Sequence, residues 1–244
     1  MERAGVAAII IGNEVLTAKV VDQNGPLLVR RLRERGVPLR SLHTVLDEVD
    51  AIVEAVDLAR RNARYVITSG GIGPTHDDVT VRAVALALGR EVVRLPEMVE
   101  RIRARAGDQL KESALRLADA PEGARLLALE GDWFPVLACE ELFLLPGVPQ
   151  LFRLQLERVL LELPGKPVVV REILLNASEP EIAPALDAIA LENPDVAIGS
   201  YPQFGRDLPF RVKVTVEHED AERVAVIVTL LEGTLPPGSI LKIV

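Results

Sequence analysis

The feature that most constrains the fold is the alternation of short apolar segments with segments of helical periodicity at the start of the chain. Residues 7–12 form a continuous apolar run that ends in glycine, a pattern typical of a strand buried on both faces of a parallel sheet. Helix, strand, helix and strand follow at residues 27–35, 39–46, 52–62 and 65–68. Because parallel strands need crossover connections, this order predicts an α/β fold, a three-layer α/β/α sandwich around a mostly parallel sheet.

The same domain is expected to continue to residues 163–167, where two prolines and a glycine interrupt every pattern. A helix over residues 79–88 is expected to have Asp78 as its N-cap and Gly89 as its stop. Further helices are predicted at residues 96–105, 109–118 and about 149–163, and strands at residues 125–129, 134–139 and 142–145.

Beyond that break the predicted order is strand, helix, strand, strand, helix, strand, at residues 168–175, 179–191, 196–200, 210–216, 221–231 and 240–244. This is the plan of an α+β module of about the size of a ferredoxin-like unit. We therefore expect a first domain of residues 1–166, which holds the site, and a smaller accessory module of residues 167–244.

Charge and cysteine content restrict the partners and the compartment. With 36 acidic and 28 basic residues the net charge is -8, which disfavours nucleic-acid partners. No apolar run is long enough to span a bilayer, and no segment has the features of an export signal. With Cys139 as the single cysteine, we expect a cytoplasmic protein in which Cys139 is a core residue. An ordinary exposed helix face is expected for the basic cluster Arg30, Arg31, Arg33 and Arg35.

Polar and glycine-rich loops follow four of the predicted strands of the first domain. Ligands of open parallel sheets bind outside the carboxyl ends of the strands, where such loops gather. We therefore expect one site formed by Gly12 with Glu14, by Asp47, by the loop of residues 69–78, and by Pro146 with Gly147.

The loop of residues 69–78 has the composition of a phosphate site. Its glycines, Gly70, Gly71 and Gly73, allow a tight turn that presents backbone N–H groups to an anion beside the next helix. Ser69 and Thr75 are further candidates for ligand binding. The loop is neither a P-loop, since no Gly-Lys-Ser/Thr follows, nor a dinucleotide fingerprint. From spacing alone, an ordinary turn is an equally good explanation.

Two adjacent carboxylates, Asp77 and Asp78, close this loop. They would repel a bare phosphate, so either a divalent cation, Mg²⁺ or alternatively Mn²⁺ or Co²⁺, bridges them to it, or one of them serves only as a helix cap. Asp47 and Glu14 on neighbouring loops would complete a site for a hard cation.

Three other side chains have two possible roles each. His76 is either a donor to phosphate or a solvated loop residue. Trp133 and Phe134 either stack on a flavin or purine ring or pack within the protein.

Residues 70–80, Gly-Gly-Ile-Gly-Pro-Thr-His-Asp-Asp-Val-Thr, resemble the signature of the molybdopterin-binding domain superfamily. The form is the one shared by the competence/damage-inducible protein CinA and the N-terminal domain of eukaryotic FAD synthase. Residues 12–16 and 145–149 are also similar to that family, whereas Gln23 departs from its usual Asp/Asn-Thr-Asn motif. Residues 133–136, 198–202 and 212–214 look closer to FAD synthase than to CinA.

The resemblance implies metal-dependent hydrolysis of a nucleotide diphosphate, ADP-ribose or FAD, to two monophosphates. In this scheme Asp78, Asp77 and Asp47 are the metal ligands, Asp47 alternatively orients water, and Glu14 is the candidate general base. The chain is not expected to make FAD. A non-catalytic molybdopterin- or flavin-nucleotide-binding protein is the alternative, and a partner-binding protein descended from an enzyme is a third class. A homo-oligomer, dimer or trimer, is expected, whose ligand is a nucleotide or pterin phosphate.

Overall fold

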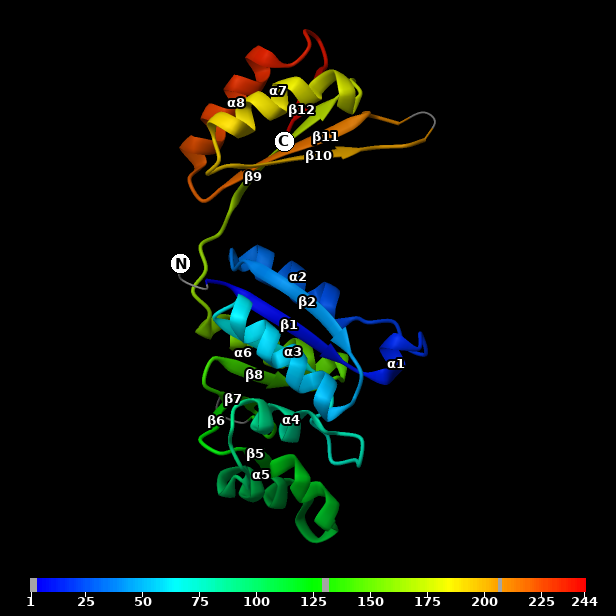
Figure 1. Cartoon of the computed structure of the whole chain (residues 1–244), viewed down its shortest axis with the longest axis vertical. Helices are drawn as coiled ribbons and strands as arrows, with labels where there is room; N and C mark the ends of the chain where they lie inside the picture. The colour runs from blue at the N-terminus through cyan, green and yellow to red at the C-terminus, as the bar shows by residue number, and fades with distance from the viewer. Residues whose placement is uncertain (1–3, 129–131, 206–207) are drawn as a thin grey trace. The chain divides into compact units, whose positions relative to one another are not determined.

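The computed structural model describes residues 4–128, 132–205 and 208–244 (Figure 1). The chain divides into two compact units, Met1–Gly165 and Lys166–Val244. This division lies one residue before the boundary expected from the sequence. No helix within the described ranges is both long enough and apolar enough to cross a membrane.

The first unit is built on a sheet whose strand order, over the described residues, is β2-β1-β3-β8-β7-β6. The pairs β1–β2, β1–β3 and β3–β8 are parallel, while β8–β7 and β7–β6 are antiparallel. The mostly parallel sheet predicted from the sequence is therefore confirmed. The strand bounds are β1 Val6–Ile11, β2 Leu39–Val45, β3 Tyr65–Ser69, β6 Arg125–Leu127, β7 Val136–Cys139 and β8 Leu142–Leu145.

Helices cover both faces of this sheet and produce the three layers. On one face, α2 (Asn24–Arg35) and α6 (Pro149–Glu162) pack in a core that includes Leu28, Phe143 and Phe152. On the other, α3 (Val49–Asn62) and α4 (Thr80–Ala87) share a second core with β1 and β8. Because β1 is buried along its whole length, both of its faces contribute to these cores, as its unbroken apolar sequence predicts.

Three elements of the first unit were not expected: α1 (Asn13–Leu16) and the antiparallel pair of β4 (Val92–Arg94) and β5 (Asp119–Pro121). The helix predicted at residues 109–118 is of 3₁₀ and not of α type, and it is divided into η1 (Gly107–Gln109) and η2 (Glu112–Ala118). In η2 the buried residues Leu115 and Ala118 are three apart, the repeat of a 3₁₀ helix. They pack against Met98 and Ile102 of α5 (Pro96–Ala106).

The second unit is an antiparallel sheet covered by two helices. Its strand order, over the described residues, is β10-β11-β9-β12, and every pair is antiparallel. The two helices share one core with the sheet, built around Ile173, Val214 and Ile227. The predicted ferredoxin-like order is confirmed by β9 Val169–Leu175, α7 Glu179–Glu192, β10 Ala197–Pro202, β11 Val212–His218, α8 Ala221–Thr234 and β12 Ile240–Ile243.

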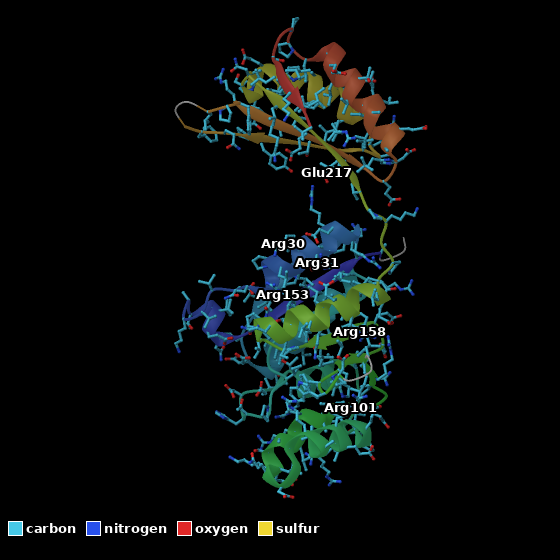
Figure 2. The ribbon with its side chains drawn as sticks, turned by 180° about the vertical axis from the view of Figure 1, so that it is seen from behind. Arg30, Arg31, Arg101, Arg153, Arg158 and Glu217 are labelled. Carbon is cyan, nitrogen blue, oxygen red and sulfur yellow. The ribbon has the colours of Figure 1, made fainter. Side chains whose placement is uncertain are left out.

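The arginines of α2 lie on an exposed surface, as expected. Arg30, Arg33 and Arg35 are exposed. Arg31, labelled with Arg30 on α2 in Figure 2, pairs with Glu34 and with Glu157 of α6. These hydrogen bonds raise the pKa of Arg31 above its ordinary range, so the group stays charged at any working pH.

Candidate functional site

The loops that follow β1, β2, β3 and β8 meet at the carboxyl edge of the sheet and enclose a pocket of about 450 Å³. This volume lies within the range of about 300–1,000 Å³ that is usual for small-molecule sites. The pocket is lined by Ile11, Glu14, Asp47, Gly70, Gly71, Ile72, Gly73, Asp77, Asp78, Pro146, Gly147, Val148 and Leu151.

Gly70 and Gly71 are required where the loop leaves β3. Both have positive φ, 109° for Gly70 and 66° for Gly71. A β-carbon on Gly70 would lie 2.1 Å from the carbonyl oxygen of Ile11, and one on Gly71 would lie 2.2 Å from Oγ1 of Thr80. These two positions therefore need glycine both for their backbone angles and for their close approach to β1 and α4.

The backbone N–H groups of this loop have two different roles. The N–H of Gly70 donates to the carbonyl of Leu145 (3.0 Å), so it is not available to a ligand. Among the described residues, the N–H groups of Gly71 and Gly73 make no hydrogen bond. Both of these residues line the pocket, so the loop has donors left over for an anion.

Asp47 joins the loops that follow β1 and β2. Its carboxylate accepts the N–H of Asn13 (2.7 Å), and the Asn13 side chain accepts the N–H of Asp47 in return (3.3 Å). Burial raises the pKa of Asp47 above its ordinary value, and the nearby charges of Glu14, Asp77 and Asp78 raise it further. The structure thus brings together four carboxylates from three loops.

Asp78 does not cap α4. The N-cap position is Val79, and the Asp78 carboxylate folds back to accept the N–H (2.8 Å) and the hydroxyl of Thr75. The expectation of a helix cap is therefore wrong, because the Asp78 carboxylate accepts from Thr75 within the loop and α4 has no side-chain cap hydrogen bond. Thr75 uses its hydroxyl within the loop, and the same hydroxyl lowers the pKa of Asp77. Since a hydroxyl carries one proton, it serves one of the two carboxylates at a time.

The residues of the pocket fit a hard divalent cation in chemistry but do not form a complete cage. In the part of the chain that the structure describes, no three His, Cys, Asp or Glu side chains are close enough together to hold a metal ion. Mg²⁺ is commonly held by one or two carboxylates together with substrate phosphates, so it needs no such cage. The carboxylate of Glu14 lies close to Gly12, and Glu14 is one of the residues that line the pocket.

Ser69 and Asn24 fix the loops to one another. Asn24, at the start of α2 and only 5% exposed, donates to the Ser69 hydroxyl (2.9 Å) and to the carbonyl of Gly147 (2.8 Å). Ser69 is buried and lies 3.4 Å from the carbonyl oxygen of Pro146. Neither Ser69 nor Gly12 lines the pocket, so we assign both to positioning the loops. The sequence does not single out Asn24 as a site residue, and its one signal is its place in the segment of residues 22–24, which resembles the Asp/Asn-Thr-Asn motif of the family.

A second pocket, of about 390 Å³, lies against the same glycine-rich loop. Ile72, Gly73 and Asp78 line both pockets, but this one also has Arg82 and Arg116 in its lining. Sequence reasoning missed both arginines, which come from α4 and from η2. His76 also lines this second pocket, with its side chain 95% exposed. The first pocket is thus acidic, whereas the second has two arginines beside two carboxylates, Asp78 and Asp119.

Two residues outside these pockets can also be placed. Cys139 is a buried residue of β7, and burial raises the pKa of its thiol, which favours the unreactive thiol form. Trp133 lies against Phe134, with ring centroids 5.2 Å apart, and the guanidinium of Arg105 lies over the Trp133 ring at 4.4 Å. Both aromatic rings line a third pocket, which Leu151 shares with the acidic pocket.

The sequence matches two protein families. Residues 7–183 match the family described as a probable molybdopterin binding domain, and residues 167–244 match the middle domain of FAD synthase. A protein from Thermococcus kodakarensis is 36% identical over an alignment that covers 80% of this chain and 85% of that protein.

Two other relatives carry informative names. A protein of Caenorhabditis elegans named probable FAD synthase is 32% identical over 96% of this chain but only 50% of its own length. This chain therefore spans about half of that relative. The crystal structure of CinA from Thermoplasma acidophilum, described as of unknown function, superposes with a TM-score of 0.59 at 29% identity over 64% of this chain and 96% of CinA. The predicted resemblance is confirmed: the chain belongs to the family of probable molybdopterin binding domains, in a form related to CinA and to FAD synthase.

Proposed function

We propose that this protein is a metal-dependent nucleotide pyrophosphatase that splits ADP-ribose or FAD with water into two monophosphates. The observation that carries the proposal is the content of the acidic pocket. Four acidic residues line one space of about 450 Å³ together with two glycines whose N–H groups make no hydrogen bond among the described residues. Carboxylates alone would repel a pyrophosphate, but carboxylates with a divalent cation, beside N–H donors, form a site for one.

Each residue of the pocket has a proposed role. Asp78 and Asp47 hold the cation, with Asp77 as the alternative to Asp78, while the N–H groups of Gly71 and Gly73 bind phosphate oxygens. Glu14 accepts the proton of the attacking water, whose oxygen bonds to one phosphorus as the bridging P–O bond breaks. When bound, the cation (Mg²⁺, Mn²⁺ or Co²⁺) neutralises charge on the phosphates and makes water a better nucleophile.

Two features support a dinucleotide as the substrate. The relatives include a probable FAD synthase, and residues 167–244 match the middle domain of FAD synthase. The second pocket places Arg82 and Arg116, together with Asp119, against the same glycine-rich loop. Fixed cations there suit the second charged group of an extended substrate.

The test is release of AMP from ADP-ribose and from FAD by the pure protein, with each cation and with a chelator. Asp78→Asn keeps an oxygen that can accept the N–H of Thr75, so the fold should persist while turnover falls about a hundredfold or more. Asp108→Asn, at an exposed position of η1 outside the pocket, is the matched control. Full activity of Asp78→Asn would remove Asp78 from the mechanism.

A non-catalytic protein that binds a molybdopterin or flavin nucleotide is the second candidate, favoured by the family to which the chain belongs. It predicts a ligand-induced rise in Tm without any release of AMP.

We further propose that the protein is a cytoplasmic homo-oligomer, a dimer or trimer. The exposed apolar residues Leu16, Val20 and Val21 support self-association, and light scattering against the 26.6 kDa monomer mass tests it.

A further inference from the structure

The second pocket of the first unit lies beside α4, which packs against both β4 and β5 (Figure 1). It encloses about 390 Å³, within the range of about 300–1,000 Å³ that is usual for small-molecule sites. Its lining includes four aliphatic residues, two arginines and two aspartates: Ile72, Val79, Val81, Val92, Arg82, Arg116, Asp78 and Asp119. The pocket therefore offers a ligand both apolar walls and charged groups.

The two aspartates of this lining already have partners within the protein. Asp119 accepts a hydrogen bond from Nε of Arg94 (2.8 Å), and this bond raises the pKa of the Arg94 guanidinium. Asp78 accepts the N–H of Thr75 (2.8 Å) and also its hydroxyl. Neither carboxylate thus depends on the arginines of the pocket for a hydrogen-bond donor.

The two arginines, by contrast, have no carboxylate partner among the described residues. Arg116 of η2 makes one weak contact, through a terminal nitrogen that lies 3.5 Å from the carbonyl oxygen of Pro74 in the glycine-rich loop. Arg82 of α4 makes no hydrogen bond or ion pair with any described residue. Both side chains are exposed, so their guanidinium groups are accessible to a ligand in the pocket.

The position of Arg82 adds to the positive charge of this pocket. Arg82 is the third residue of α4, and the first turn of this helix has no acidic residue and no side-chain cap. Because the start of a helix has partial positive charge from its unpaired N–H groups, a cation there is unfavourable and an anion is favourable. Arg116 brings a second cation from a different element. An anion that accepts hydrogen bonds from both arginines would relieve the repulsion.

We infer that the second pocket binds a phosphate monoester, whose oxygens accept hydrogen bonds from Arg82 and Arg116 while its carbon skeleton contacts the aliphatic walls. A guanidinium group matches the geometry of phosphate with two parallel N–H donors. Gly73 and Asp78 line both this pocket and the acidic pocket, so the monoester adjoins the pyrophosphate. Resting on the proposed function for that pyrophosphate, the inference narrows the substrate class to dinucleotides with a third phosphate, on the 2′- or 3′-oxygen of a ribose.

The first test measures binding to the whole protein without metal, at fixed ionic strength. Its probes are adenosine 2′,5′-bisphosphate, adenosine 3′,5′-bisphosphate and AMP, which lacks the second monoester. At least one bisphosphate should bind roughly tenfold or more tightly than AMP in calorimetry, because hydrogen bonds between charged groups are among the strong ones. The bisphosphate that binds more tightly identifies the position of the phosphate.

Matched variants locate this binding. Arg82→Gln and Arg116→Gln remove the charge at exposed positions, so the fold should persist while the preference for the bisphosphate over AMP falls about tenfold. Arg116→Glu reverses the charge and should abolish the preference. Arg103→Gln makes the same change as the first two at an exposed position of α5 outside the pocket, and should leave the preference unchanged.

Turnover with a divalent cation tests whether the monoester belongs to the substrate. The matched pairs are 2′-phospho-ADP-ribose with ADP-ribose, and coenzyme A with dephospho-coenzyme A, which differ by one phosphate on the 2′- or 3′-oxygen. In the pair with the favoured phosphate, the phosphorylated compound should have the higher kcat/KM through a lower KM. Arg116→Gln should bring this ratio of kcat/KM values toward one.

The outcomes separate this inference from the proposed function. Tight bisphosphate binding that is lost in both Arg→Gln variants of the pocket, in a protein that hydrolyses none of these compounds, supports the phosphate site and refutes the hydrolase. Turnover of ADP-ribose with no preference for either phosphorylated compound overturns the inference and leaves the hydrolase standing. Equal affinity of the wild-type protein for the three probes, or an equal loss in Arg103→Gln, also overturns the inference.

Discussion

Replacing Gly70 with alanine tests whether the glycine-rich loop is built as described. Its φ of 109° is a region that residues with a β-carbon avoid, at a cost of about 1–3 kcal/mol. The new β-carbon would also lie 2.1 Å from the carbonyl oxygen of Ile11, which belongs to a buried strand and cannot move freely. Relieving such an overlap costs about another 1–3 kcal/mol. Gly70→Ala should therefore lower the free energy of unfolding by about 2–6 kcal/mol, a large part of the 5–15 kcal/mol typical of a folded protein.

Gly89→Ala provides the matched control. Gly89 also has a positive φ, 64°, but no atom lies within 4 Å of the position of its β-carbon. Gly89→Ala should lower the free energy of unfolding by only about 1–2 kcal/mol, the penalty of the backbone angle alone. Urea unfolding followed by the emission of Trp133 measures both, because this single tryptophan belongs to the Met1–Gly165 unit. Equal losses for Gly70→Ala and Gly89→Ala would refute the close approach of the loop to β1.

Two further predictions concern charge and domain organisation. The raised pKa of Asp47 means that its carboxyl group binds a proton more tightly in the native state than in the unfolded chain. Ionisation of Asp47 therefore destabilises the native state as the pH rises from 3.8, the ordinary pKa, through the higher pKa of the native state. Without a cation, Asp47→Asn should thus raise Tm at pH 7, and Mg²⁺ should stabilise the wild type more than the variant; the reverse order in thermal scans would reject Asp47 as a ligand. A fragment of residues 1–165, which contains three cores of its own, should fold and keep the kcat of the whole chain. A folded fragment with background kcat would mean that the second unit supplies part of the site.

The layers of the fold could be predicted because buried strands and helices each leave a recognisable pattern of apolar residues in the sequence. The unbroken apolar run of β1 is that of a strand buried on both faces, and Gly36, with φ of 67°, follows α2 where the sequence indicated a stop. The 3₁₀ turns of η2 could not be predicted in the same way. Their apolar residues also match helical spacing, and only packing against α5 selects the tighter turn.

The convergence of four loops at one edge of the sheet could also be predicted, because the carboxyl ends of parallel strands share that edge. The hydrogen-bond partners within these loops could not. Asp78 follows the loop as an N-cap would, yet it bonds to Thr75, because the path of the loop brings that residue nearer. Arg82 and Arg116 lie far apart in the sequence, and only the packing of the fold places both in the lining of the second pocket.

The most direct test of the proposed pyrophosphatase activity is hydrolysis of ADP-ribose and of FAD in ¹⁸O-labelled water, with the products analysed by mass spectrometry. The proposed reaction forms one new P–O bond from water and breaks the bridging P–O bond. With a divalent cation, each turnover should therefore give two monophosphates, AMP with ribose 5-phosphate or with FMN, that together carry one ¹⁸O atom. Absence of both products with every cation, or products formed without ¹⁸O, would contradict hydrolysis at this pocket.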